Sequence, residues 1–503
     1  MVDKGLTGGK KIILIVIDSL IPKILETCLD SGTVPGMEFL SRKGQLCFDC
    51  VSVFPTMTPV ATSSIATGVF PNRHQIPGFI WYHRGEKRII NYGATPLAIL
   101  KTGFDIVLKD LLYHLNGQHL SRETRTVHEI LEEHGVSSAS INFYIFRGLS
   151  CFKVRLPFWA RLLSGIWNCP DVKGPSTSVV GQIVPPEFPC KGALKKPGGF
   201  LQRFGVNDEF AGTTAYYLIK GGKQPDFTVV YLPDMDSFAH RHHIKDTSQA
   251  VITADRQVQK ILNAFGSWQE AVENNIFIVV GDHSQSLVCK KHGSIINLSR
   301  LLSGFSLLGL GEINNGRYQL AVCPNERMAH IYLLKDIDGL KPGVLKILAA
   351  DSRIDQIMWR ETRDGTDVYN VIRGGCIGRL TFSKGGSLSD LYGAAWNIKG
   401  DLGIIDARTE DKRIIYGHYP DALNLMASLM SASHCGDIVV TARPGFEFGG
   451  EAAPVHPGRG SHGSFHQDDI YVPLITSGGK PIGPNPRIVD IVPYILDNYG
   501  ISF

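Results

Sequence analysis

Short apolar runs, most of them rich in β-branched residues, recur along the chain. They cover residues 12–17, 227–232, 276–280, 437–440 and 470–475. Near-continuous apolar runs of this length are typical of strands buried on both faces. The intervening segments, such as 248–265, have helical spacing. The pattern therefore predicts an α/β core with a doubly wound, mostly parallel sheet covered by helices on both faces.

This alternation of strands and helices is interrupted twice. Residues 170–199 are rich in Pro, Gly and Ser, which predicts a long loop within an excursion of about 143–204. Between residues 301 and 391 the alternation is lost, although a strand is predicted at 330–334. We therefore expect one core made of residues 1–300 and 392–503, with a smaller α+β cap, residues 301–391, inserted into it.

The composition is that of an ordinary globular protein. A net charge of +4 over 503 residues gives no reason to expect a nucleic-acid polymer as partner. The first apolar run is too short to span a membrane and lacks a cleavage site for secretion, so we expect a cytoplasmic protein. Ten cysteines are scattered, and Cys47 with Cys50 forms a single CxxC motif, for which reduced thiols are the expectation.

Acidic and imidazole side chains lie next to the ends of the apolar runs. In open α/β sheets, ligands bind beyond the carboxyl ends of the strands, so these positions are candidates for function. Any one of them could instead cap a turn, but their joint occurrence is harder to explain that way. Only Asp and His occur, which borderline divalent metals prefer as ligands. The residues are Asp18, Asp236, His240, Asp282, His283 and His462.

The segment around Thr58 is a further candidate for function. A short strand is predicted to end near Phe54, Thr58 can act as N-cap with Pro59 at the first helical position, and Gly68 ends the helix. Free backbone N–H groups at a helix start favour phosphate oxygens. A hydroxyl is a weak nucleophile, so a catalytic role for Thr58 requires an activator such as a bound metal.

Together these residues resemble the alkaline-phosphatase superfamily, and most nearly its type I phosphodiesterase/nucleotide pyrophosphatase family. The resemblance leaves the excursion and the cap unmatched. The motifs that carry it are Asp18, Phe54-Pro55-Thr56-Met57-Thr58, Ile65-Ala66-Thr67-Gly68, Pro71, His74, the Asp236/His240 pair, Asp282-His283 and His462-Gly463.

The resemblance implies two divalent metal ions, zinc with manganese as the alternative. Asp236, His240 and His462 would hold one ion. Asp18, Asp282 and His283 would hold the other, with the Thr58 oxygen bridging towards it. Thr58 would attack phosphorus and form a covalent phospho-threonine intermediate. Two ions about 4 Å apart can stabilise both the attacking and the leaving oxygen of an in-line displacement.

Two departures from the family pattern concern the substrate. The family usually has an asparagine three residues after the nucleophile to hold a phosphate oxygen, whereas this chain has Ala61, and Thr62 is the candidate replacement. The family's Asp-His-Gly is here Asp282-His283-Ser284. The predicted helix after Thr58 contains no Arg or Lys to neutralise a monoester dianion, so we expect a small-molecule phosphodiester as substrate.

Several alternatives remain open at this point. A sulfatase is excluded because Thr58 replaces its Cys or Ser nucleophile. A phosphonate hydrolase, a phosphomonoesterase, a phosphomutase and a non-catalytic relative that binds a phosphorylated ligand share the residue pattern. Basic and aromatic residues in 143–163 could contact an anionic lipid, but Pro157 interrupts the helix and favours a buried lid. The oligomeric state is left open.

Overall fold

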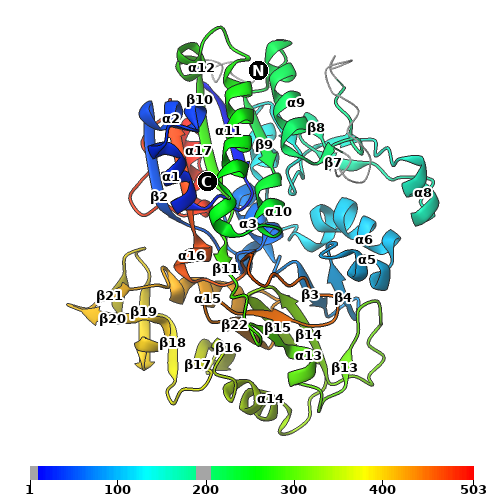
Figure 1. Ribbon diagram of the computed structural model, residues 1–503, viewed down its shortest axis with the longest axis vertical. Helices are drawn as coiled ribbons and strands as arrows, with labels where there is room; N and C mark the ends of the chain where they lie inside the picture. Colours follow the sequence, from blue (N-terminus) through cyan, green and yellow to red (C-terminus); the bar gives the residue numbers. More distant parts are fainter. Residues whose placement is uncertain (1–8, 188–204) are drawn as a thin grey trace.

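The computed structural model describes residues 9–187 and 205–503. Figure 1 shows two large sheets along the long axis of the molecule, one in the upper half and one in the lower half. The upper sheet contains the strand formed by the first apolar run, and the lower sheet contains most of the predicted cap.

The upper sheet has seven strands in the order β2-β25-β10-β1-β9-β5-β8. The strands β10, β1, β9, β5 and β8 are parallel neighbours, whereas β25 is antiparallel to β10 and β2. The predicted α/β class with a mostly parallel sheet is confirmed. The bounds are β1 Lys11–Ile17, β2 Gly44–Val51, β5 Ser138–Ile141, β8 Thr177–Val179, β9 Phe227–Leu232, β10 Asn275–Gly281 and β25 Tyr471–Ser477.

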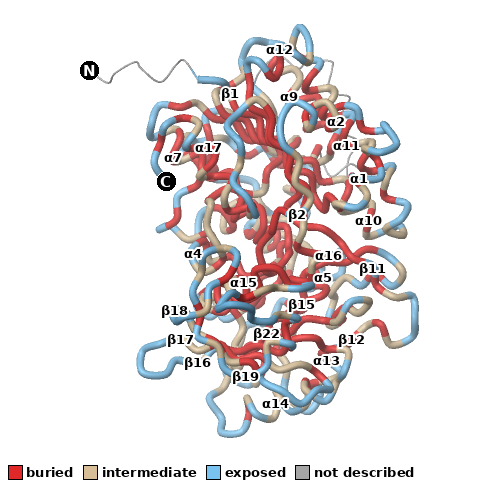
Figure 2. The backbone as a smooth tube through the Cα atoms, turned by 90° about the vertical axis from the view of Figure 1, so that its left-hand side faces the viewer, coloured by how far each residue is buried: buried red, intermediate tan, exposed pale blue. Residues whose placement is uncertain are grey.

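Helices cover both faces of this sheet because its strands are apolar on both sides. Along β1, Ile13 and Ile15 face one buried cluster, while Ile12 and Leu14 face another. One cluster is completed by α1 (Pro22–Asp30), α2 (Pro35–Arg42), α9 (Asp208–Lys220), α10 (Asp234–Ala239), α11 (Ser248–Leu262) and α12 (Trp268–Asn274). The opposite cluster is completed by α3 (Thr58–Thr67), α7 (Val127–Glu133) and α17 (Ile491–Asn498). Figure 2 shows the strands of this layer as buried.

The lower sheet has ten strands in the order β13-β14-β15-β22-β16-β17-β18-β21-β20, with β19 paired to β18. The strand predicted at 330–334 is β15. Bounds are β13 Leu307–Leu308, β14 Leu320–Asn325, β15 Met328–Leu333, β16 Ile354–Arg363, β17 Thr366–Arg373, β18 Leu380–Asp390, β19 Ala395–Gly400, β20 Ala407–Glu410, β21 Arg413–Tyr416 and β22 Ile438–Ala442.

One strand was assigned to the wrong sheet from the sequence. The run 437–440 was expected in the main sheet, but it forms β22, which lies between β15 and β16 and is antiparallel to both. The error has a physical reason, since β22 is buried on both faces and so has the same apolar pattern as a strand of the main sheet. The division at 301–391 stays a prediction; strands of the lower sheet run from Leu307 to Ala442.

Two helices cover the lower sheet, and one of them faces the upper part of the molecule. The helix α14 (Leu340–Ala349) packs on one face. The helix α15 (Ala422–Met430) packs on the other, in a cluster that also contains Phe54 and Phe465. The two sheets therefore share a hydrophobic core rather than being joined by a linker.

The excursion folds around a small hydrophobic cluster of its own. It packs against α6 (Phe104–Lys109) and η1 (Asp110–His119), and it contains β6 (Ser150–Phe152), α8 (Phe158–Ser164) and β7 (Val172–Gly174). The prediction of a buried lid is wrong for α8, because Phe158 is 71% exposed and Leu162 and Leu163 are also exposed. Among the described residues, only one face of this short helix packs against the cluster. Residues 188–204 of the excursion lie outside the described residues.

The remaining elements are short. They are β3 (Ile80–His83), β4 (Arg88–Asn91), β11 (Ser286–Leu287), β12 (Ile295–Asn297), β23 (Glu447–Gly449), β24 (Gly460–Ser461), α4 (Pro71–His74), α5 (Pro96–Thr102), α13 (Leu298–Leu301), α16 (Gln467–Ile470), η3 (Ile244–Asp246), η4 (Leu402–Ile405) and η5 (Ile488–Asp490). Within the described ranges, no helix combines the length and apolar character needed to cross a membrane. Cys47 and Cys50 on β2 are both free thiols, and burial raises the pKa of Cys47 to about 12.

Candidate functional site

Three of the predicted ligands meet beyond the end of β9. Asp236 lies in α10, directly after that strand, and His240 follows the same helix. His462 follows β24 and approaches from the other side. Asp236 Oδ1 lies 3.1 Å from His240 Nε2 and 3.5 Å from His462 Nε2. The predicted first cluster therefore exists as a group of neighbouring side chains.

The other three predicted ligands meet beyond the ends of β1 and β10. Asp18 follows β1, while Asp282 and His283 follow β10. His283 Nε2 lies 3.5 Å from Asp18 Oδ1 and 3.8 Å from Asp282 Oδ2, and all three residues are buried. The two clusters are adjacent, because the rings of His283 and His462 stack with centroids 4.0 Å apart.

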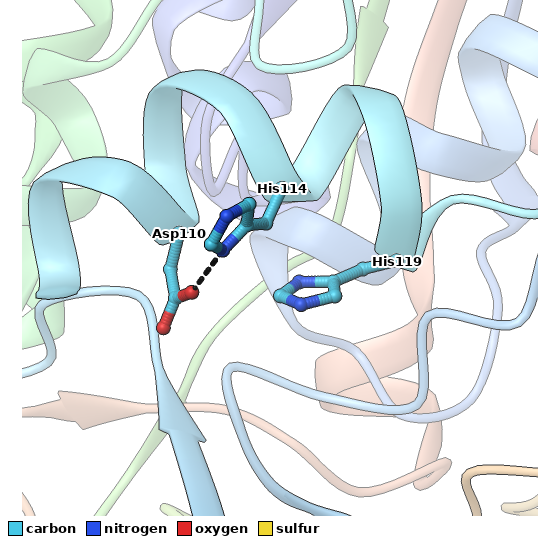
Figure 3. A group of neighbouring side chains, drawn as sticks. All are labelled: Asp110, His114 and His119. Carbon is cyan, nitrogen blue, oxygen red and sulfur yellow. Dashed lines mark hydrogen bonds and ion pairs between the residues drawn. The ribbon is translucent and has the colours of Figure 1, made fainter. Parts of the chain in front are cut away.

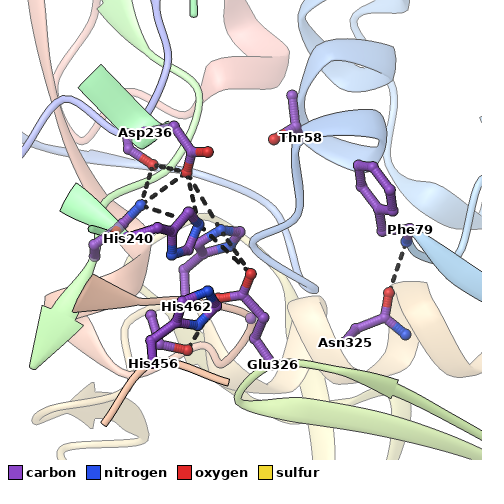
Figure 4. Close-up of polar contacts among 12 residues, drawn as sticks. Thr58, Phe79, Asp236, His240, Asn325, Glu326, His456 and His462 are labelled. Carbon is purple, nitrogen blue, oxygen red and sulfur yellow. Dashed lines mark hydrogen bonds and ion pairs between the residues drawn. The ribbon is translucent and has the colours of Figure 1, made fainter. Parts of the chain in front are cut away.

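Thr58 lies at the second cluster. Its Oγ1 is 3.2 Å from His283 Nε2, and Figure 4 shows the hydroxyl oxygen on the side that faces Asp236 of the first cluster. The predicted N-cap role is wrong: Met57 is the N-cap, with no side-chain bond, and Thr58 is the first residue of α3. Because the hydroxyl makes no capping bond, it is available for chemistry. Gly68 ends the helix, as predicted, and it has the left-handed conformation common at helix ends.

Glu326 is a site residue that the sequence did not reveal. Its Oε1 lies 3.6 Å from Nε2 of both His240 and His462 (Figure 4). Its Oε2 accepts hydrogen bonds from Ser461 Oγ at 2.9 Å and from the His462 amide at 3.1 Å. Thus the lower sheet contributes a carboxylate to a site whose predicted ligands all lie in segments joined to the upper sheet.

The backbone of Glu326 is unusual and explains how it reaches the site. Glu326 and Arg327 form the two-residue turn between β14 and β15, and Glu326 has a φ of 57°. Glycine, Asn or Asp is the usual residue there, so Glu is strained. The neighbouring Asn325 holds the turn in place, since its Oδ1 accepts from the amides of Phe79 and Ile80. A non-glycine residue at such a turn is the only sequence signal that points to Glu326.

His456 is the second residue that the sequence did not reveal. Its ring stacks on His240 with centroids 4.1 Å apart, and its Nδ1 lies 3.1 Å from Glu447 Oε2. Together with Glu326 and His240 it forms another possible ligand group. It lies in a loop with no adjacent apolar run, so a search for polar residues at the ends of apolar runs could not select it.

Ser19 connects the two clusters, and Gln285 supports the first one. Ser19 donates from Oγ to Asp236 Oδ1 at 2.9 Å and from its amide to Asp282 Oδ1 at 3.1 Å. Gln285 Nε2 also donates to Asp236 Oδ1, at 2.8 Å. These bonds fix the orientation of carboxylates in both clusters, as polar neighbours of metal ligands commonly do.

Burial and charge shift the pKa values of the site in opposite directions. Burial opposes ionisation of Asp236 and Glu326, but the nearby histidines prevail and lower both pKa values, that of Glu326 to about 2. Burial likewise opposes protonation of His240, but Asp236 and Glu326 raise its pKa to about 10. In the second cluster, burial raises the pKa of Asp282 to about 7.

The predicted substrate-binding residues are both fully buried. Ala61 packs in the core, and Thr62 Oγ1 donates to the Thr58 carbonyl at 2.6 Å within α3. Their role in substrate binding stays a prediction.

Comparison with known proteins gives the class, the phosphoester hydrolases with the alkaline-phosphatase architecture. The family model for type I phosphodiesterase/nucleotide pyrophosphatase matches residues 12–465, which is most of the chain. The chain therefore belongs to that family, and the resemblance inferred from its motifs is confirmed.

Solved structures show the same fold at low sequence identity. Murine ectonucleotide pyrophosphatase/phosphodiesterase 5 matches with a TM-score of 0.56 and 11% identity, over 98% of this chain and 96% of that chain. Phosphonoacetate hydrolase from Sinorhizobium meliloti 1021, in complex with phosphonoformate, matches with a TM-score of 0.53 and 15% identity, over 97% and 96%. No curated protein sequence matches the chain significantly.

Proposed function

We propose that the chain hydrolyses phosphodiesters, nucleotide pyrophosphates among them, through a covalent phospho-threonine intermediate on Thr58. The observation that carries this proposal is the position of the Thr58 hydroxyl, at the start of a helix and 3.2 Å from His283 Nε2, beside both clusters. Related support comes from the murine relative, whose inactive threonine-to-alanine form was solved in complex with AMP.

The residues of the two clusters fit a pair of divalent cations, zinc or alternatively manganese. The donors in the clusters are carboxylate and imidazole groups, and Asp282 Oδ2 is buried without a hydrogen-bond partner in the described part of the chain. Asp236, His240 and His462 would hold one ion, and Asp18, Asp282, His283 and Thr58 the other. When bound, the ions would lower the pKa of a coordinated hydroxyl and neutralise the charge that develops on phosphoryl oxygens.

The chain's own groups would then perform two displacements. The Thr58 oxygen attacks phosphorus, the bond from phosphorus to the leaving alkoxide breaks, and a Thr58–phosphate ester forms. Water next attacks this ester and restores the hydroxyl, with release of the phosphate monoester. Ser19 and Gln285 keep Asp236 oriented throughout, because both donate to its Oδ1.

The charges of the site support a diester rather than a monoester. The carboxylate of Glu326 adds negative charge to the first cluster, which disfavours a phosphate dianion. Arg327 follows Glu326 in the chain, but its guanidinium forms an ion pair with Asp469, with Nη1 2.6 Å from Oδ1. A phosphonate substrate is the second candidate, favoured by the structural similarity to a phosphonoacetate hydrolase.

The test compares Thr58→Ala with a matched control in the same helix. Thr67→Ala also removes a buried threonine hydroxyl, which donates to the Ser63 carbonyl within α3. We expect Thr58→Ala to lower kcat for bis-p-nitrophenyl phosphate by about 10³-fold or more, with metal content unchanged, and Thr67→Ala to retain most activity. Wild-type kcat/KM should be higher for this diester than for p-nitrophenyl phosphate. Near-wild-type turnover by Thr58→Ala would show that the nucleophile is another residue.

A further inference from the structure

Another group of acidic and imidazole side chains lies outside the two catalytic clusters. Asp110, His114 and His119 all come from η1, and one ligand atom of each lies within 4.8 Å of the others (Figure 3). Asp110 and His119 are buried, while His114 is partly exposed at the rim. None of the three has a role in the proposed reaction.

The unusual form of η1 is what brings these side chains together. The sequence separations are four and five residues, nine in total. In an α-helix, nine residues make about two and a half turns, which would place Asp110 and His119 on opposite sides. The segment is instead a π-helix of ten residues. Because its wider turn takes between four and five residues, nine residues make about two turns. Long π-helices are rare, and π-turns occur frequently at functional sites.

His119 presents an unused nitrogen to this group. Its Nδ1 lies 2.8 Å from the hydroxyl of Tyr92, whereas its Nε2 is buried and has no hydrogen-bond partner among residues 9–187 and 205–503. The carboxylate oxygen Oε1 of Glu86 is 3.6 Å from this Nε2, too far for a hydrogen bond. A buried polar atom without a partner is destabilising. Histidines that bind metals commonly use one nitrogen as ligand and donate the other N–H to a fixed oxygen, here that of Tyr92.

Arg88 orients the two carboxylates of the group. It donates from Nη1 and Nη2 to the two oxygens of Asp110, at 2.7 and 2.8 Å, and from Nε to Glu86 at 2.7 Å. Asp110 Oδ1 also lies 2.8 Å from His114 Nδ1. Two carboxylates and one guanidinium leave a net charge of −1 before any cation binds. Carboxylate ligands of metals are commonly held by such hydrogen bonds.

The nearby His83 does not qualify as a ligand. Its Nδ1 accepts a hydrogen bond from the Glu86 amide at 2.9 Å, so the proton of the neutral ring must be on Nε2. The ring therefore has no free lone pair for a cation. This leaves Glu86, in the turn between β3 and β4, as the nearest additional donor.

We propose that Asp110, His114, His119 and Glu86 form a structural site for one borderline divalent transition-metal ion, such as Zn²⁺. Four ligands of the imidazole and carboxylate types complete the tetrahedral set of a structural zinc site. Bonds of about 2.1 Å to a tetrahedral ion place ligand atoms about 3.4 Å apart. The ligand atoms from η1 lie within 4.8 Å of one another, and Glu86 Oε1 is 3.6 Å from His119 Nε2, so side-chain rotations are needed to close the site. The ion joins η1 to the β3–β4 hairpin.

The test measures zinc content of the full-length chain. Wild type, His114→Ala and the control His134→Ala are stripped with a chelator, dialysed against the same excess of Zn²⁺ and analysed for zinc per chain. His134 is a matched control because it is also partly buried at a helix end, with one hydrogen bond, to the Ile130 carbonyl. We expect wild type and His134→Ala to hold one more zinc per chain than His114→Ala. This difference does not depend on how far the catalytic clusters fill.

A second variant covers the case in which His114→Ala misfolds. Glu86→Gln removes the charge of a partly exposed side chain, and we expect it to weaken the binding of one Zn²⁺ at least tenfold. With Co²⁺ in place of Zn²⁺, both variants should lose the visible absorption of one tetrahedral ion. Equal metal content and equal spectra in folded wild type and variants would overturn the proposal and leave the group as an ion-pair network.

Discussion

Glu326→Gln is the substitution that most directly tests how the two sheets cooperate at the active site. The change keeps the shape of the side chain, and an amide oxygen can still accept from Ser461 Oγ and the His462 amide. What is lost is one negative charge 3.6 Å from Nε2 of His240 and of His462. We therefore expect weaker binding of a cation by the first cluster.

The magnitude follows from the distance and the surroundings. At an effective dielectric constant of about 20, two unit charges 3.6 Å apart interact by about 4–5 kcal/mol. The desolvation of a buried carboxylate offsets much of this energy. Substitution of residues that support metal ligands typically weakens metal affinity 10–100-fold, or about 1.4–2.7 kcal/mol. We expect a loss in that range for Glu326→Gln.

The assay is a zinc titration of the metal-stripped protein, combined with kcat and KM for bis-p-nitrophenyl phosphate. At limiting zinc, Glu326→Gln should have lower kcat/KM, and saturating zinc should recover most of it. Glu451→Gln serves as control because Glu451 is partly exposed and pairs with Lys101 on the surface. If zinc affinity and kcat/KM of Glu326→Gln stay within about twofold of wild type, the reasoning about this residue is refuted.

Three further outcomes are expected. Removal of metal with a chelator should abolish turnover, and added zinc or manganese should restore it; full activity in a preparation shown to be metal-free would contradict the two-metal proposal. Arg327→Met should destabilise the fold by about 3–5 kcal/mol in urea unfolding, because it leaves Asp469 buried without its partner. Burial lowers the pKa of His128 to about 3, so below about pH 6.5 the unfolded chain binds a proton that the folded chain does not, and stability falls as pH falls towards 3. His128→Gln should make the loss of unfolding free energy between about pH 6 and 4 shallower by about 1.4 kcal/mol per pH unit; an unchanged slope would show that His128 does not titrate this way.

The rule that polar residues at the ends of apolar runs are functional candidates selected side chains that the structure brings together, while their roles as ligands stay predictions. Asp18 and Asp282 follow parallel strands, and such strands end at the same edge of a sheet, so their proximity follows from the pattern alone. The rule could not select Glu326 or His456, because one lies in a tight turn of the other sheet and the other in a loop. Glu326 follows the apolar residues of β14, but that strand was not predicted from the sequence, whereas His456 has no adjacent apolar run.

The fold class was predicted from the sequence, but the pairing of every strand was not. The run that forms β22 is apolar on both faces, and the same pattern suits the interior of either sheet. The choice depends on contacts with β15 and β16 that lie far apart in the sequence. In η1, the separation of Asp110 and His119 indicates opposite faces if an α-helix is assumed. Only the observed π-helix puts them on one face.

The hairpin that carries Glu326 also bears on how the molecule unfolds. Its tip is held from the upper half, since the Arg327 amide donates to the His462 carbonyl and its guanidinium pairs with Asp469. A ligand that binds where Glu326, His240 and His462 converge would contact both halves at once. Its binding free energy would therefore oppose separation of the halves as well as unfolding of either one. Metal-loaded protein should unfold in a single cooperative transition. If the two halves unfold separately, their separate transitions should appear first in the metal-free protein.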